Sequence, residues 1–242
     1  MGLNKPCDSG APHNLPEYTV RRSPRAKKVR LRVDLDGSVT VVVPARTRIT
    51  GHDDFVRRHA DWVRRQQERF AGLRSQARPL SADGEGTVQY RGRAVPVTIQ
   101  PSADGRISVR YDGEAFTVRR PEIATDEHVR TIFRVWFRQV ARPLFEARVM
   151  ALNEITGYNW QRIRIGEQKT KWGSCSSRGT LSFNWRLLMA PPEILDYVVI
   201  HELAHLKEPN HSPAFWALVQ QLCPDHKTHR KWLNQHGSLL AL

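Results

Sequence analysis

Apolar and polar residues alternate in several short stretches of the first half of the chain. From Val29 to Leu35 every second residue is apolar, which is typical of a strand with one buried face. Asp36-Gly37 follows as a hairpin signal, and residues 39–43 return as the partner strand. Residues 52–73 carry apolar side chains at helical spacing and predict one helix. Further short strands are predicted at residues 88–90, 95–99, 107–111 and 116–118.

The second half mixes helical and strand patterns. Residues 125–155 predict one long helix, and strands at 162–165 and 180–187 flank a polar loop at 169–179. The strand from Thr180 to Arg186 is expected to be the edge of the sheet, where an extended peptide could pair. A helix buried on one side is predicted from Pro191 onward, followed by shorter helices at 212–222 and about 227–235.

These patterns predict an α+β fold in three parts. Residues 1–16 are polar and contain prolines, which predicts a disordered N-terminus. Residues 17–120 are expected to form a small, basic, β-rich region with one helix, and residues 75–86 have the composition of a linker. Residues 121–242 are expected to form the core, with the helix after Pro191 packed beside a small sheet.

Charge and cysteine usage narrow the class of protein. The net charge is +14, and residues 1–120 carry +10 of it, so a nucleic acid or another polyanion is a candidate partner. No apolar run approaches the roughly 20 residues of a membrane-spanning helix, and residues 1–15 contain no apolar signal segment. The three cysteines are few and far apart, which favours a reducing compartment and predicts a cytoplasmic location.

The chemistry is concentrated in residues 201–211, which contain H-E-x-x-H and a third histidine. On a helix, His201 and His205 lie on one face and can direct two imidazoles at one zinc ion. Pro209-Asn210 is expected to end the helix and turn the chain, so that His211 becomes the third ligand. Glu202 then lies beside the metal, where its carboxylate can take a proton from bound water.

Two other metal arrangements differ from this one in the third or fourth ligand. An acidic third ligand further downstream has one candidate, because Asp225 is the only acidic residue after Glu208. Cys175 could instead close the fourth position, which would make the zinc structural. The spacing to His211 equals that of metzincins, but Glu208 replaces their glycine and no matching Met-turn follows.

Residues 172–177 (WGSCSS), 183–187 (FNWRL) and 201–211 together resemble the YgjP-like metallopeptidase domain family. That family is similar in its core to the SprT and WLM groups of minimal zincins. The resemblance implies a zincin-like core with zinc ligands at His201, His205 and His211 and a general base at Glu202. It also implies that five further residues lie near the cleft as tentative substrate-binding residues: Trp172, Gly173, Ser174, Asn184 and Arg186.

The sequence thus predicts a zinc metallopeptidase that cleaves peptide or protein substrates with a glutamate-assisted, zinc-bound water. One alternative is a metal-dependent phosphohydrolase acting on nucleotides, with phosphate held by Lys169, Lys171, Arg178 or Arg186. A second alternative is a nucleic-acid-associated protein with a structural zinc. Candidates for a donor to the developing oxyanion are Asn184, Arg186 and Trp172.

Overall fold

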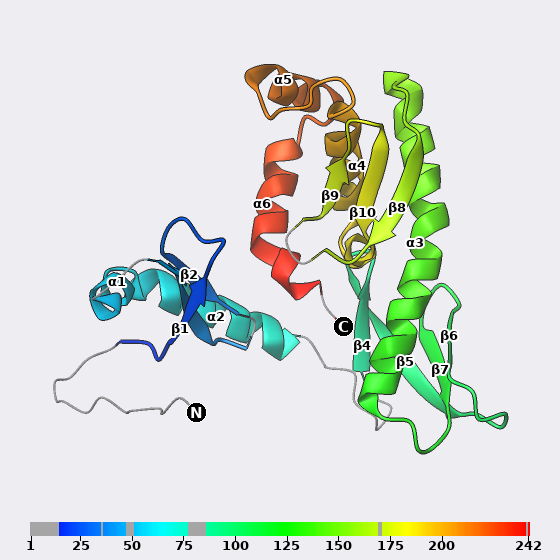
Figure 1. Ribbon diagram of the computed structural model, residues 1–242. Helices are drawn as coiled ribbons and strands as arrows, with labels where there is room; N and C mark the ends of the chain where they lie inside the picture. The colour runs from blue at the N-terminus through cyan, green and yellow to red at the C-terminus, as the bar shows by residue number, and fades with distance from the viewer. Residues whose placement is uncertain (1–14, 35, 47–50, 77–85, 169–170, 241) are drawn as a thin grey trace. The chain divides into compact units, whose positions relative to one another are not determined.

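A computed structural model describes residues 15–34, 36–46, 51–76, 86–168, 171–240 and 242 of the chain (Figure 1). The chain divides into two compact units, residues 1–76 and residues 77–242. Residues 1–14 of the expected disordered N-terminus, and residues 77–85 of the expected linker, lie outside the described residues. No described helix is long and apolar enough to cross a membrane.

The first unit is a small sheet with two helices. Its strands are β1 (Thr19–Ser23), β2 (Arg30–Val33) and β3 (Val39–Pro44), in the order β1-β3-β2. The predicted hairpin joins β2 to β3 antiparallel, with Gly37 in the left-handed conformation that the turn requires. β1 pairs with β3 in parallel. Val41 and Val43 of β3 and Val56 form the centre of this unit's core.

The helix predicted at residues 52–73 is two helices, α1 (His52–Arg58) and α2 (Ala60–Gln76). The break is at His59, whose φ of −112° lies outside the helical range. The backbone N–H of His59 bonds the Val56 carbonyl, and the His59 ring Nδ1 lies 2.8 Å from the Phe55 carbonyl. Because the side chain takes the carbonyl that a continuous helix would use, the prediction of one helix was wrong at this residue.

The second unit begins with a four-stranded sheet packed on a long helix (Figure 1). The strands are β4 (Gly86–Tyr90), β5 (Arg93–Pro101), β6 (Ser108–Tyr111) and β7 (Phe116–Arg120), in the order β4-β5-β7-β6. β5 and β7 are parallel and the two outer pairs antiparallel. The helix is α3 (Asp126–Thr156), which starts at a Thr125 capping box and ends at Gly157 in the left-handed conformation.

The structure groups residues 86–120 with the second unit, whereas the sequence placed the boundary at residues 120 and 121. Val97 and Phe116 share one hydrophobic core with Phe137 of α3 and with the residues that carry the metal motif. The turn between β4 and β5 also donates two backbone hydrogen bonds to the carbonyls of Leu188 and Met189, at 2.8 and 3.1 Å. A strand pattern shows which residues are buried but not which element covers them.

A second sheet carries the residues around the motif. Its strands are β8 (Arg162–Gly166), β9 (Gly173–Cys175) and β10 (Thr180–Asn184), in the order β8-β10-β9. β10 is therefore the central strand, and the prediction that it forms the edge was wrong. The edge nearest the motif is β9, a short strand inside the segment predicted as a loop, paired antiparallel with β10. Trp185–Met189, predicted partly as strand, forms the 3-10 helix η1.

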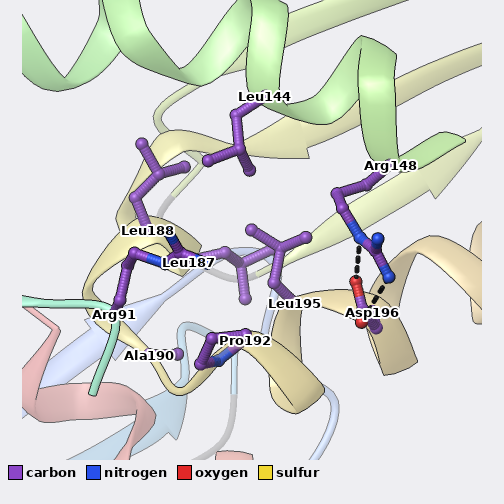
Figure 2. Close-up of a pocket in the computed structure, with 9 residues that line it drawn as sticks. All are labelled: Arg91, Leu144, Arg148, Leu187, Leu188, Ala190, Pro192, Leu195 and Asp196. Carbon is purple, nitrogen blue, oxygen red and sulfur yellow. Dashed lines mark hydrogen bonds and ion pairs between the residues drawn. The ribbon is translucent and has the colours of Figure 1, made fainter.

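The remaining helices complete the unit: α4 (Pro192–Ala204), α5 (Pro213–Leu222), α6 (His226–His236) and the 3-10 helix η2 (Gly237–Leu239). α4 is buried around most of its circumference, not on one side as its apolar stripe predicted. One exception is Asp196, which binds Arg148 of α3 through two hydrogen bonds of 2.7 Å (Figure 2). This ion pair joins α4 to α3 beside an apolar cavity of about 250 Å³.

Candidate metal centre

The helix that carries the motif is short and ends sooner than predicted. Pro192 occupies its first turn, where a missing N–H costs nothing. The helix ends at Ala204, and the backbone N–H groups of residues 206–208 then donate to the carbonyls of Leu203 and Ala204. Pro209-Asn210 therefore does not end the helix but lies in the loop that leads to His211. Ser212 then caps α5 by accepting a hydrogen bond from the Phe215 N–H at 3.2 Å.

This loop brings the three predicted histidines together. The Nε2 atoms of His201 and His211 lie 3.0 Å apart. One ligand atom from each of His201, His205 and His211 lies within 4.8 Å of the others. Two nitrogens bound to one tetrahedral zinc ion at about 2.0–2.1 Å would lie about 3.4 Å apart. The three rings therefore have the spacing that a single ion can bridge.

Neighbouring groups fix the orientation of these rings. The Nδ1 of His205 lies 3.1 Å from the Glu208 carbonyl, so a proton on Nδ1 can be donated there and Nε2 keeps its lone pair. Phe215 of α5 is fully buried and packs against all three imidazoles, with ring centroids 4.4 to 4.9 Å apart. Trp216 stacks on His211 at 5.6 Å. The cap and apolar face of α5 thus hold the ligands in place.

The site also favours the neutral form of imidazole that binds a metal. Burial, together with the neighbouring His205, His211 and Arg230, lowers the pKa of His201 to about 3. Burial likewise lowers the pKa of His211. At neutral pH the ring nitrogens of these two residues are therefore free of an extra proton and available as ligands.

Glu202 lies on α4 next to the first of these histidines and is 4% exposed. Burial raises the pKa of its carboxyl to about 8, opposed by the charge of Lys171 and by a backbone hydrogen bond from Cys175. Its Oε2 has no hydrogen-bond partner among the described residues. A divalent cation held by the three histidines would favour the ionised carboxylate, whose free oxygen can then accept a proton from water.

Gly173 lets the edge strand β9 pass directly against Glu202. A Cβ at this position would lie 2.5 Å from the Glu202 Oε1, 2.7 Å from Cγ and 2.8 Å from Cδ. Contacts this short are essentially never found between real atoms, so only glycine leaves room for the carboxylate as it is placed. Gly173 therefore determines where the Glu202 carboxylate can lie. The amino-acid sequence alone did not reveal this role.

A cleft of about 420 Å³ opens over the three histidines and Glu202. Trp172, Gly173 and Ser174, three of the predicted substrate-binding residues, line it along β9. Cys175 also lines the cleft, but the group of metal-type ligands found among the described residues contains only the three histidines. Burial and the nearby Glu202 charge raise the pKa of the Cys175 thiol to about 11.

The other two predicted substrate-binding residues do not line this cleft. Asn184 is buried, and its Nδ2 donates to the carbonyls of Gln168 and Lys171 at 2.9 and 3.4 Å. Arg186 binds Glu167 at 2.6 Å and stacks on the Trp185 ring. Both side chains bind the segment between β8 and β9. Because neither lines the cleft, neither is placed to serve as an oxyanion donor.

The sequence missed the contribution of α6 and of two buried residues of α4 to the cleft. Arg230, Leu233 and Asn234 line the cleft from α6, and Tyr197 and Val198 line it from α4. The spacing of Arg230, Leu233 and Asn234 places them on one helical face, which is a usable signal. The polar composition of residues 226–236 hides this signal, because it is also typical of a solvated helix. His226 is in fact buried.

An H-E-x-x-H helix beside a small sheet, with a third histidine delivered by the next loop, is an arrangement typical of metallopeptidases. The chain belongs to the YgjP-like family: the family model described as YgjP-like, metallopeptidase domain, matches residues 27–236. Membership of a metallopeptidase family implies a divalent metal.

Comparison with other proteins adds two findings. The crystal structure of the metallopeptidase zymogen of Pyrococcus abyssi abylysin is similar to part of the chain, at 28% sequence identity. The similarity covers 38% of this chain and 93% of that one, with a TM-score of 0.35. A search of curated proteins gave no match.

Proposed function

We propose that this protein is a zinc-dependent peptidase in which His201, His205 and His211 hold the metal and Glu202 is the general base. The observation that carries the proposal is the grouping of the three imidazoles, with ligand atoms within 4.8 Å of one another, beside a buried carboxylate. Three nitrogen ligands and one open position are typical of catalytic zinc sites. When bound, zinc lowers the pKa of water and polarises a carbonyl group.

The chain's own residues supply the remaining steps. Glu202 accepts a proton from the attacking water on its free oxygen and passes it to the nitrogen of the departing amine. Gly173 sets the position of that carboxylate. The edge strand β9 has one side unpaired within its sheet, so an extended peptide can bind along it through backbone hydrogen bonds. The last feature favours a peptide over other substrates.

A phosphoester hydrolase is the second candidate, and the observation that favours it is the presence of cations at the cleft. Lys171 lines the cleft and Arg178 lines the cavity that adjoins it. Arg186, also a candidate for phosphate binding, is paired with Glu167 instead, and Lys169 lies outside the described residues. Nucleotides and peptides assayed side by side separate this function from the first.

The test of the proposed peptidase is Glu202→Gln. Glutamine keeps the shape of the side chain but cannot accept the proton, so the variant should bind one zinc per chain and lose peptide hydrolysis by about 10²-fold or more. Zinc content by mass spectrometry and cleavage of a fluorogenic peptide library are measured on the same samples. Turnover equal to that of the wild type would reject Glu202 as the base.

A further inference from the structure

The cleft over the three histidines continues into a second cavity of about 480 Å³. Both cavities are lined by Cys175, His205 and Pro209, so they meet beside the metal site. The second cavity lies beyond the end of β9, where the turn from Ser176 to Gly179 and the segment around Gln161 line it. A substrate lying along β9 would therefore contact both cavities.

Three cations and one carboxylate line this continuous trough. Lys171 and Arg230 line the cavity over the histidines, and Arg178 lines the second cavity. All three are exposed, and none forms an ion pair with a carboxylate of the part of the chain that the structure describes. Glu202 is the only acidic residue among the described residues lining either cavity, and it is buried next to the histidines.

Two of these charges line the same cavity as the reacting groups. Arg230 is held over the ring of Trp216, with its Cζ 4.9 Å from the centroid, so its position is set by a ring that also packs on His211. Lys171 immediately precedes Trp172 and Gly173, and all three line the cavity over Glu202. The trough is therefore positive where the scissile bond would lie, and also beyond the end of β9.

We propose that the cleft selects acidic peptides, with aspartate or glutamate side chains on the substrate lying against Lys171, Arg178 and Arg230. The inference rests on the proposed peptidase function and narrows its substrate class. Complementary charge favours encounter and binding of an acidic segment, whereas a basic segment would be repelled at both cavities. Each exposed charge contact is expected to contribute about 1.5- to 5-fold, so three together give between about 3- and 100-fold, with about tenfold as the central expectation.

Three fluorogenic peptides of identical length test the proposal, with the same neutral centre and two residues on each side that are all glutamate, all glutamine or all lysine. Cleavage is measured with the zinc-loaded wild type. Binding of the same peptides, without the fluorogenic pair, is measured by fluorescence anisotropy with zinc-loaded Glu202→Gln, which reports preference without turnover. The glutamate peptide should exceed the glutamine peptide by about tenfold in both assays. That advantage should shrink as sodium chloride rises.

Charge reversal identifies the responsible residues. Arg178→Glu and Lys171→Glu should each lower the ratio of glutamate-peptide cleavage to glutamine-peptide cleavage by about 3- to 10-fold. The matched control is Arg138→Glu on α3, an exposed arginine that lines neither cavity and should change none of the peptides.

The outcomes separate this inference from the proposed function. Absence of cleavage of every peptide, with preferential binding of the glutamate peptide, would reject the peptidase and keep the charge preference. Cleavage and binding that are equal for glutamate and glutamine, or greater for lysine, would overturn the preference and keep the peptidase. A single-stranded oligonucleotide is added as a competitor for binding of the labelled glutamate peptide. The preference for acidic peptides would also be overturned if this oligonucleotide competed as well as the unlabelled glutamate peptide and if Arg178→Glu left its competition unchanged.

Discussion

Gly173→Ala tests whether the edge strand positions the general base. The added Cβ would lie 2.5 Å from the Glu202 Oε1, whereas ordinary contact begins at 3.4 Å. The carboxylate must therefore move by about 0.9 Å, or β9 must move away from α4. A misplacement of about 1 Å at a reacting group costs about 10²-fold in rate, which corresponds to about 2.7 kcal/mol in the activation barrier.

The φ of Gly173 is not positive, so alanine is compatible with the backbone and the clash with Glu202 is the source of the effect. We expect kcat for a fluorogenic peptide to fall about 100-fold while zinc content stays at one per chain. Overpacking should also lower the free energy of unfolding by about 1–3 kcal/mol. Gly72→Ala, where a Cβ would meet nothing within 4 Å, is the matched control and should leave kcat unchanged.

A kcat within about threefold of the wild type would refute this role for Gly173. So would loss of zinc together with activity, because that result would place the damage at the histidines. The double variant Gly173→Ala with Glu202→Asp adds a further check. The shorter carboxylate leaves room for the new methyl group, so alanine should cost less in that background than in the wild type.

Three other predictions concern the supports of the site and the basic half of the chain. Asp196→Asn should lower the free energy of unfolding by about 1 kcal/mol, because it breaks the half-exposed ion pair with Arg148. Glu146→Gln, in an exposed ion pair on α3, should change the free energy of unfolding by less than about 0.5 kcal/mol, and chemical denaturation measures both variants. Metal-free protein should lose stability as the pH falls from 6.5 towards 3, because the folded pKa of His201 is about 3 and only the unfolded chain binds the proton in this range. Urea titrations at several pH values measure this, and the free energy of unfolding of His201→Asn should depend less on pH. If residues 17–120 bind nucleic acid, affinity should fall steeply with salt, and a flat response would contradict that partner.

The grouping of the three histidines could be predicted from the sequence because the information that determines it is local. Residues four apart on a helix share a face whatever surrounds them, and a loop of a few residues leaves His211 little freedom. The strand and turn positions of the first half were predicted for the same reason, as with the hairpin at Gly37. These features depend on residues that are close in the chain.

Features that depend on distant packing were missed. Gly173 and Glu202 are far apart in the sequence, and no periodic pattern shows that one leaves space for the other. Asn184 is polar and ends the central strand β10, yet its amide donates to two backbone carbonyls and the residue does not line the cleft. Arg230 contributes to the cleft because α6 packs on α4, a contact that a polar C-terminal helix does not disclose.

The most direct test of the metal centre is X-ray absorption at the zinc edge on purified protein, with zinc content measured in parallel. The account predicts one zinc per chain with three nitrogen ligands from imidazole at about 2.0–2.1 Å, and loss of the metal in His205→Ala. Sulfur scattering at about 2.3 Å, which would make Cys175 a ligand, or a wild type that binds no divalent metal, would contradict it.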